Sequence, residues 1–191
     1  MAGSTLDILD SLAPDYDAFM ALSDPFHFKV CEQRIKISPK YWAANYPIIS
    51  RHAYNWTEVK YTDLEAHLAG NPPTANGVGV YLFIVKPDNL VHSLPGFVFY
   101  VGIAGENASR RTLQQRLSEY LYVSQISKRE AIHLALQKYY RNTYVAYSIV
   151  NLQPADLIQL EEAFHGFYYP WAGKRDFPVA IKTQQKAWGE I

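Results

Sequence analysis

The stretch that decides the fold is GVGVYLFIV at residues 77–85, followed by GFVFYVG at residues 96–102. Both runs are rich in β-branched and aromatic residues, which favour half-buried strands. A polar, proline-containing segment, residues 86–95, joins them and exceeds the usual hairpin loop of about two to five residues. The two runs therefore predict an antiparallel hairpin with a decorated loop.

The sequence after this hairpin predicts helices over residues 112–121, 127–140 and 154–169 and a strand over residues 143–152. In the first helix Leu113, Leu117 and Leu121 recur at helical spacing. Pro154 suits the first turn of the last helix. The order β-β-α-α-β-α predicts an α+β fold, in which a small three-stranded antiparallel sheet is flanked by helices.

The Pro-, Gly- and Asn-rich stretch at residues 70–77 marks the predicted domain boundary. Residues 1–75 contain an aromatic-rich segment, so we expect them to form an N-terminal accessory segment that packs on the core. Residues 76–191 are expected to form the core with a C-terminal extension.

The composition excludes several classes of protein. A chain with 49% hydrophobic residues is not disordered, and no apolar run approaches the roughly 18–20 residues of a membrane helix. The single cysteine, Cys31, excludes an internal disulfide and a Cys-based zinc cluster. The N-terminus carries early acidic residues and no basic-then-apolar run, so we expect no secretory signal and a cytoplasmic location.

The charge is balanced in total but not along the chain. Eighteen Lys and Arg residues offset eighteen Asp and Glu residues, which argues against a dedicated nucleic-acid binder. Residues 110–141 nevertheless carry seven basic side chains and only two acidic ones. This segment forms either a local basic surface or an ordinary solvated helix face.

Two charged residues fall on the apolar sides of their predicted helices. Glu161 lies within or beside a stripe formed by Leu157, Leu160 and Phe164, and Arg116 borders the buried face of its helix. A charge on a packing face requires compensation, unless both residues simply reach water at the rim. Together they indicate a site with one carboxylate and one fixed cation.

Such a pair suits phosphoryl transfer. One carboxylate can anchor Mg²⁺ that keeps several water ligands, and a guanidinium can hold a phosphate group through two hydrogen bonds. The hairpin supplies Tyr81 and Tyr100 as candidate general bases. A nearby metal and cation would lower the pKa of such a tyrosine from about 10.

At these positions the sequence resembles the GIY-YIG nuclease superfamily. The motifs are Gly79-Val80-Tyr81, then Tyr100-Val101-Gly102, then LQQRLSEYL, then LEEAF followed by Pro170. The resemblance covers roughly residues 77–170. Ile103 stands where family members often carry Lys, and no Asn follows Pro170 where one is often expected.

The resemblance implies a role for each matching residue. Tyr81 would be the base or orient the water, and Tyr100 would share that network or position the phosphate. Arg116 would contact the scissile phosphate, and Glu161 would bind Mg²⁺ or Mn²⁺. Further substrate contacts are expected from Gly102, Arg110, Arg111 and His133.

The resemblance therefore implies a divalent-metal-dependent endonuclease that hydrolyses DNA phosphodiester bonds in restriction, repair or mobile-element transfer. Its expected partner is nucleic acid, most simply DNA, with no membrane and with a possible homodimer. The alternative is a module of the same fold that binds nucleic acid or protein without cleavage. A third possibility is an α+β domain of unrelated function.

Overall fold

The computed structural model describes residues 39–73, 77–86, 96–106, 111–170, 172–173 and 177–187. Its centre is an antiparallel sheet of four strands in the order β1-β4-β2-β3. The strands are β1 (Thr57–Lys60), β2 (Gly79–Val85), β3 (Phe97–Ala104) and β4 (Thr143–Ile149). The predicted hairpin is confirmed, because β2 pairs with β3 along its whole length.

The predicted strand count of three is wrong by one. The fourth strand, β1, comes from the segment before residue 75 and pairs with β4, with Val59 opposite Val145. The sequence of β1, TEVK, is too short and too polar to stand out as a strand. Pairing with β4 supplies the hydrogen bonds that this short segment cannot make alone.

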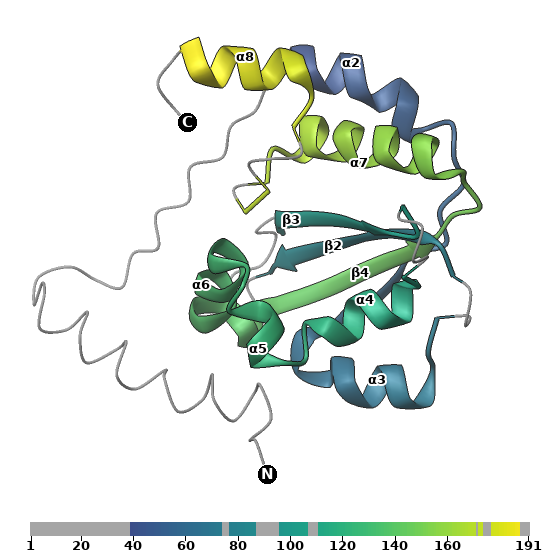
Figure 1. Ribbon diagram of the computed structural model, residues 1–191, viewed down its shortest axis with the longest axis vertical. Coiled ribbons are helices and arrows are strands. Elements are labelled where there is room, and N and C mark those ends of the chain that lie inside the picture. The colour runs from purple at the N-terminus through teal and green to yellow at the C-terminus, as the bar shows by residue number, and fades with distance from the viewer. Residues whose placement is uncertain are drawn as a thin grey trace, which may run out of the picture.

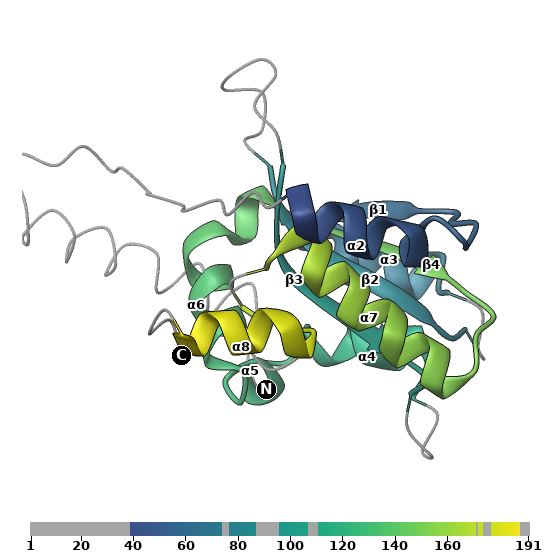
Figure 2. The same cartoon turned by 90° about the horizontal axis from the view of Figure 1, so that it is seen from above.

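Helices cover both faces of the sheet (Figures 1 and 2). On one side lie α2 (Pro39–Ile49), α7 (Pro154–Tyr168) and α8 (Val179–Ala187). On the other lie α3 (Leu64–Gly70) and α4 (Leu113–Glu119), while α5 (Val123–Ile126) and α6 (Glu130–Tyr139) gather at one end. None of the helices that the structure describes combines the length and apolar character of a membrane span.

Alternation along β2 separates two apolar cores. Tyr81 and Phe83 point to the α4 side and pack with Leu113 and Leu117. Val80 and Leu82 point to the α7 side, where the buried residues Leu157, Leu160 and Phe164 cover them. The sheet thus forms a wall between the α4 layer and the α7 layer.

A β-bulge in β3 breaks this alternation. Phe83 pairs with Tyr100 but its neighbour Ile84 pairs with Val98, so Phe99 is the extra residue of β3. The bulge lets the consecutive side chains of Phe99 and Tyr100 both pack on the α4 side. Two adjacent aromatic residues could not share one face of a regular strand.

Two glycines in the hairpin are required by packing. A side chain at Gly79 would overlap the backbone of Ser148 and the side chain of Leu113. Gly102 pairs with Tyr81 across the sheet, and a Cβ there would overlap the Tyr81 ring and hydroxyl. The glycines of both motifs therefore leave the space that β4, α4 and Tyr81 fill.

Gly102→Ala should destabilise the fold, because Tyr81 is fully buried and has no room to retreat. We expect a loss of roughly 1–3 kcal/mol in the free energy of unfolding, measured by urea denaturation. Gly70→Ala is the matched control, since nothing lies within 4 Å of the added methyl group. The control should leave stability unchanged or raise it by less than about 1 kcal/mol. Equal stability of the two variants would contradict the packing role of Gly102.

Helix α7 contributes a buried titratable side chain, His165, to the core. His165 is 0% exposed and packs edge-on against Phe177, with ring centroids 5.5 Å apart. Gly173 lies against its ring and admits no side chain there. Burial lowers the pKa of His165 to about 4.

This burial makes the fold sensitive to acid. The unfolded state takes up a proton near the ordinary His pKa of about 6.5, whereas the folded state resists protonation down to about 4. The contribution of His165 to the free energy of unfolding should therefore be fully present above a pH of about 6.5. The free energy of unfolding should fall by about 3 kcal/mol as the pH drops to about 4. His165→Gln should flatten this part of the urea-unfolding profile, and His52→Gln should not. An unchanged profile in His165→Gln would contradict the assignment.

Candidate functional site

The site is built around Arg116 on α4. A capping box begins this helix: Thr112 Oγ1 accepts from the Gln115 amide at 3.2 Å, and Gln115 Oε1 accepts from the Thr112 amide at 3.0 Å. Leu113 and Leu117 anchor the helix on the sheet, and Arg116 lies between them in sequence. The cap and the two leucines therefore fix the direction in which Arg116 leaves the helix.

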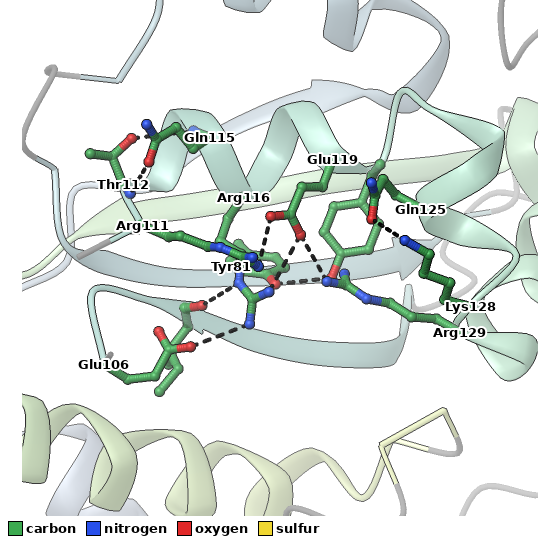
Figure 3. A network of polar contacts seen from close by, with 12 residues as sticks. Tyr81, Glu106, Arg111, Thr112, Gln115, Arg116, Glu119, Gln125, Lys128 and Arg129 are labelled. Atoms are coloured by element: carbon green, nitrogen blue, oxygen red, sulfur yellow. Dashed lines mark hydrogen bonds and ion pairs between the residues drawn. The ribbon is translucent and has the colours of Figure 1, made fainter. Parts of the chain in front are cut away.

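Arg116 extends from α4 to the edge strand of the sheet. Its Nε donates to the carbonyl of Ile103 on β3 at 3.4 Å, and its Nη2 lies 3.3 Å from Glu106 Oε1 just beyond the strand (Figure 3). The side chain is only 18% exposed. The guanidinium is thus held in a defined place and keeps its charge, because arginine does not deprotonate in proteins.

A single carboxylate gathers three arginines next to it. Glu119 Oε2 accepts from Arg129 Nη2 at 2.9 Å and from Arg116 Nη1 at 3.4 Å, and Glu119 Oε1 lies 3.0 Å from Arg111 Nη1 (Figure 3). Arg111 is half-exposed, whereas the other two guanidinium groups are largely covered. We call Arg111, Arg116, Arg129 and Glu119 the arginine cluster.

Buried phenols lie beneath the arginine cluster. The hydroxyls of Tyr81 and Tyr120 are 2.9 Å apart, and the Tyr120 backbone carbonyl accepts from Tyr61 at 2.7 Å. The guanidinium of Arg129 lies over the Tyr120 ring, 4.7 Å from its centre. The tyrosine pair therefore joins the sheet to α4 and supports the arginines from below.

The surroundings of Tyr81 determine the pKa of its hydroxyl. Burial raises the pKa of Tyr81 well above 10, although Arg116, Tyr120 and Arg129 act in the opposite direction. Burial likewise raises the pKa of Tyr120. The arginines do act to lower the Tyr81 pKa, as expected of a nearby cation, but removal of the phenol from water outweighs them and the net shift is upward. Tyr81 is a neutral hydrogen-bonding group here.

Three of the four predicted catalytic residues lie together. The ring centre of Tyr100 is 6.1 Å from that of Tyr81 and 6.2 Å from that of Tyr120, and Arg116 approaches the same strand. Glu161 lies on α7, whose buried side packs on the opposite face of the sheet. Glu161 therefore comes from the layer opposite to Tyr81 and Arg116, and a pocket shared by all four residues would have to form around the edge strand β3, which both α7 and Arg116 contact.

The predicted substrate-binding residues have different surroundings. Arg111 belongs to the arginine cluster, and Arg110 lies outside the described residues. Gly102 is buried under Tyr81, so the structure gives it a packing role. His133 lies on α6, but the residue of that region that reaches the cluster is Arg129, at the start of the helix.

Sequence reasoning missed Tyr120, Arg129, Glu106 and Glu119 as members of the site. Tyr120 recurs at helical spacing with the apolar residues of its helix, and Arg129 belongs to the basic segment at residues 110–141. Both could therefore have been considered from the sequence. Glu119 lies within the motif LQQRLSEYL and Glu106 lies before it, but neither position carried a predicted role. Their role depends on contacts between α4, β3 and the start of α6.

The described residues offer few side-chain donors for a metal ion. Within the described ranges, no group of three or more His, Cys, Asp or Glu side chains could hold an ion. A Mg²⁺ ion would therefore rely on the half-buried Glu161 and on water, which this ion accepts as ligands. A single carboxylate is compatible with Mg²⁺ but does not by itself select it.

With the geometry described, the chain was compared with known proteins. No protein-family model, no curated protein and no solved structure matches it significantly. The function of the chain therefore has to be inferred from its own residues and contacts.

The hydrogen bond between Tyr81 and Tyr120 should be measurable as a coupling energy. Tyr120→Phe should lower the free energy of unfolding by about 1–3 kcal/mol, because it leaves the buried Tyr81 hydroxyl without this contact. The double variant Tyr81→Phe/Tyr120→Phe should lose about 1 kcal/mol less than the sum of the single variants. Tyr122→Phe, which alters an exposed hydroxyl, is the control and should change little. Strict additivity would contradict the coupling.

Proposed function

We propose that the protein is a divalent-metal-dependent endonuclease that hydrolyses phosphodiester bonds, most simply those of DNA. The observation that carries this proposal is the convergence of Arg111, Arg116 and Arg129 on one carboxylate beside Tyr81 and Tyr100. Three guanidinium groups that bind one anion also suit a phosphate, which they can hold through paired hydrogen bonds.

Arg116 is the group proposed to hold the scissile phosphate. Its contacts with Ile103 and Glu106 fix the guanidinium before substrate arrives, so little reorganisation accompanies binding. Hydrolysis would add the water oxygen to phosphorus and break the bond to the leaving oxygen, which takes up a proton. The fixed positive charge would oppose the negative charge that builds up on the phosphate oxygens.

The tyrosines are proposed to position this machinery. Tyr81 is neutral, so its hydroxyl would orient Tyr120 and through it Arg129. Tyr100 is half-buried at the edge of the same cluster and remains the phenol with access to a substrate. Glu161 would hold Mg²⁺ or Mn²⁺, which supplies charge stabilisation at the phosphate when bound.

A second function is favoured by the burial of Tyr81. A fully buried neutral phenol cannot accept a proton from water at ordinary pH, and Glu119 already neutralises part of the arginine charge. A module that binds nucleic acid without cleavage would show these features. The two functions differ in one measurable property, the appearance of new ends in the nucleic acid.

Digestion of supercoiled plasmid and end-labelled oligonucleotides with Mg²⁺ or Mn²⁺ tests the proposal. Wild-type protein should cut, and Arg116→Ala should cut at least about 100-fold more slowly, because it removes the fixed cation. Arg51→Ala, which removes an exposed arginine after α2, is the control and should retain the wild-type rate. Thermal melting should accompany each variant to separate catalysis from folding.

A matched pair on α7 tests the metal assignment. Glu161→Gln should abolish cutting, whereas Glu162→Gln, which alters the exposed neighbouring carboxylate, should not. Cutting that persists in Glu161→Gln would overturn the role of Glu161. Binding without cutting under all conditions would support the non-catalytic module instead.

A further inference from the structure

A polar groove opens directly beside the arginine cluster. It has a volume of about 740 Å³ and runs along the outer side of α4 towards α5. Its lining consists of Arg111, Gln114, Gln115, Ser118, Glu119, Tyr122 and Gln125. Amides, a hydroxyl, one cation and one aromatic ring are the groups that recognise a nucleotide, with its anionic phosphate, flat base and polar base edges.

The aromatic ring of the groove is unusually open. Tyr122 is 62% exposed, although it lies between α4 and α5 in a chain whose other site tyrosines are buried or, for Tyr100, half-buried. An exposed ring flanked by amide side chains can stack on a base while the amides meet the base edge. Gln125 is held in place by Lys128, whose Nζ lies 3.3 Å from Gln125 Oε1, and this lysine adds positive charge near the groove.

The groove and the arginine cluster share two residues. Arg111 and Glu119 line the groove, and the same carboxylate also binds the more buried Arg116 and Arg129. A phosphate that entered from the groove would meet Arg111 and Glu119 before it met Arg116 and Arg129. The Glu119 carboxylate thus lies between the open groove and the two more buried guanidinium groups.

We propose that the groove binds one unpaired nucleotide of a nucleic-acid strand, and that its phosphate displaces Glu119 from the arginines. The base stacks on Tyr122, and Arg111 turns from Glu119 to the phosphate. Glu119 acts as an internal anion that keeps the guanidinium groups in place until the strand arrives. This inference rests on the proposed action on nucleic acid and names the strand segment that the site takes.

An unpaired nucleotide fits these features better than a duplex. Base faces in a duplex are stacked on each other, so Tyr122 would find only an edge or a backbone. A single strand or a frayed end offers a free face together with its phosphate. The groove therefore predicts tighter binding to single-stranded than to double-stranded oligonucleotides of the same length.

Fluorescence anisotropy with a labelled single-stranded oligo-dT, a matched duplex and inorganic phosphate as competitor tests this inference on the full chain. Glu119→Gln should bind the single strand about tenfold more tightly, because the competing anion is removed. The slope of log K against log salt should become steeper by about 0.7, because the carboxylate that the wild type releases takes up a counterion and the variant has no such carboxylate. Glu58→Gln is the matched control, since it removes a carboxylate from the separate ion pair with Lys86.

Tyr122 gives a second and independent readout. Tyr122→Ala should weaken single-strand binding at least about fivefold and leave duplex binding nearly unchanged, because stacking on one base is lost. Tyr122→Phe keeps the ring and should bind like the wild type. Tyr46→Ala removes another exposed tyrosine, on α2, and should have no effect. Since Tyr122 is exposed, its loss does not threaten the fold.

The inference is overturned if Glu119→Gln binds no tighter than Glu58→Gln, or if Tyr122→Ala weakens duplex and single strand alike. Competition by inorganic phosphate equal to that by a nucleoside monophosphate would reduce the site to a plain anion site and also overturn the role of the base. These binding assays need no cleavage. Failure of the nuclease proposal therefore shows in the plasmid assay, and failure of this inference shows in the anisotropy.

Discussion

The packing of Tyr81 over Gly102 is the constraint on which the rest of the site depends. Gly102 leaves a space on β3, the Tyr81 ring of β2 fills it, and the Tyr81 hydroxyl then reaches Tyr120 at the end of α4. The sheet thereby fixes the helix that carries Arg116. Any displacement of Tyr81 would be transmitted through Tyr120 to the stacked Arg129.

Around this contact, the arginines act to lower the pKa of the phenols, whereas burial raises it. The phenols are removed from water, which keeps them neutral, while the guanidinium groups above them remain charged. Neutral rings support the cations by packing and by their π faces, and the carboxylates of Glu106 and Glu119 supply the counter-charge. The site is therefore organised as a cationic layer on an apolar base, at one edge of the sheet.

Much of this architecture could be predicted from local sequence, and some of it could not. The hairpin and the helix carrying Arg116 follow from residue types and spacing, because each is decided by its own segment. The strand β1 was missed, since four residues of which three are polar become a strand only through pairing with β4. Glu106, Glu119 and Arg129 were missed for the same kind of reason: their roles depend on neighbours from other elements. The Tyr81 pKa was misjudged because sequence gives no measure of burial.

The outer edge of β3 has a further consequence. β3 ends the sheet, yet its carbonyls are not all available: Phe99 accepts from the Ala172 amide at 3.0 Å, and Ile103 accepts from Arg116. An uncovered terminal strand invites a second chain to add its own strand and begin aggregation. Arg116, which is proposed to bind a phosphate, thus also occupies a carbonyl of β3 that another strand would need for pairing.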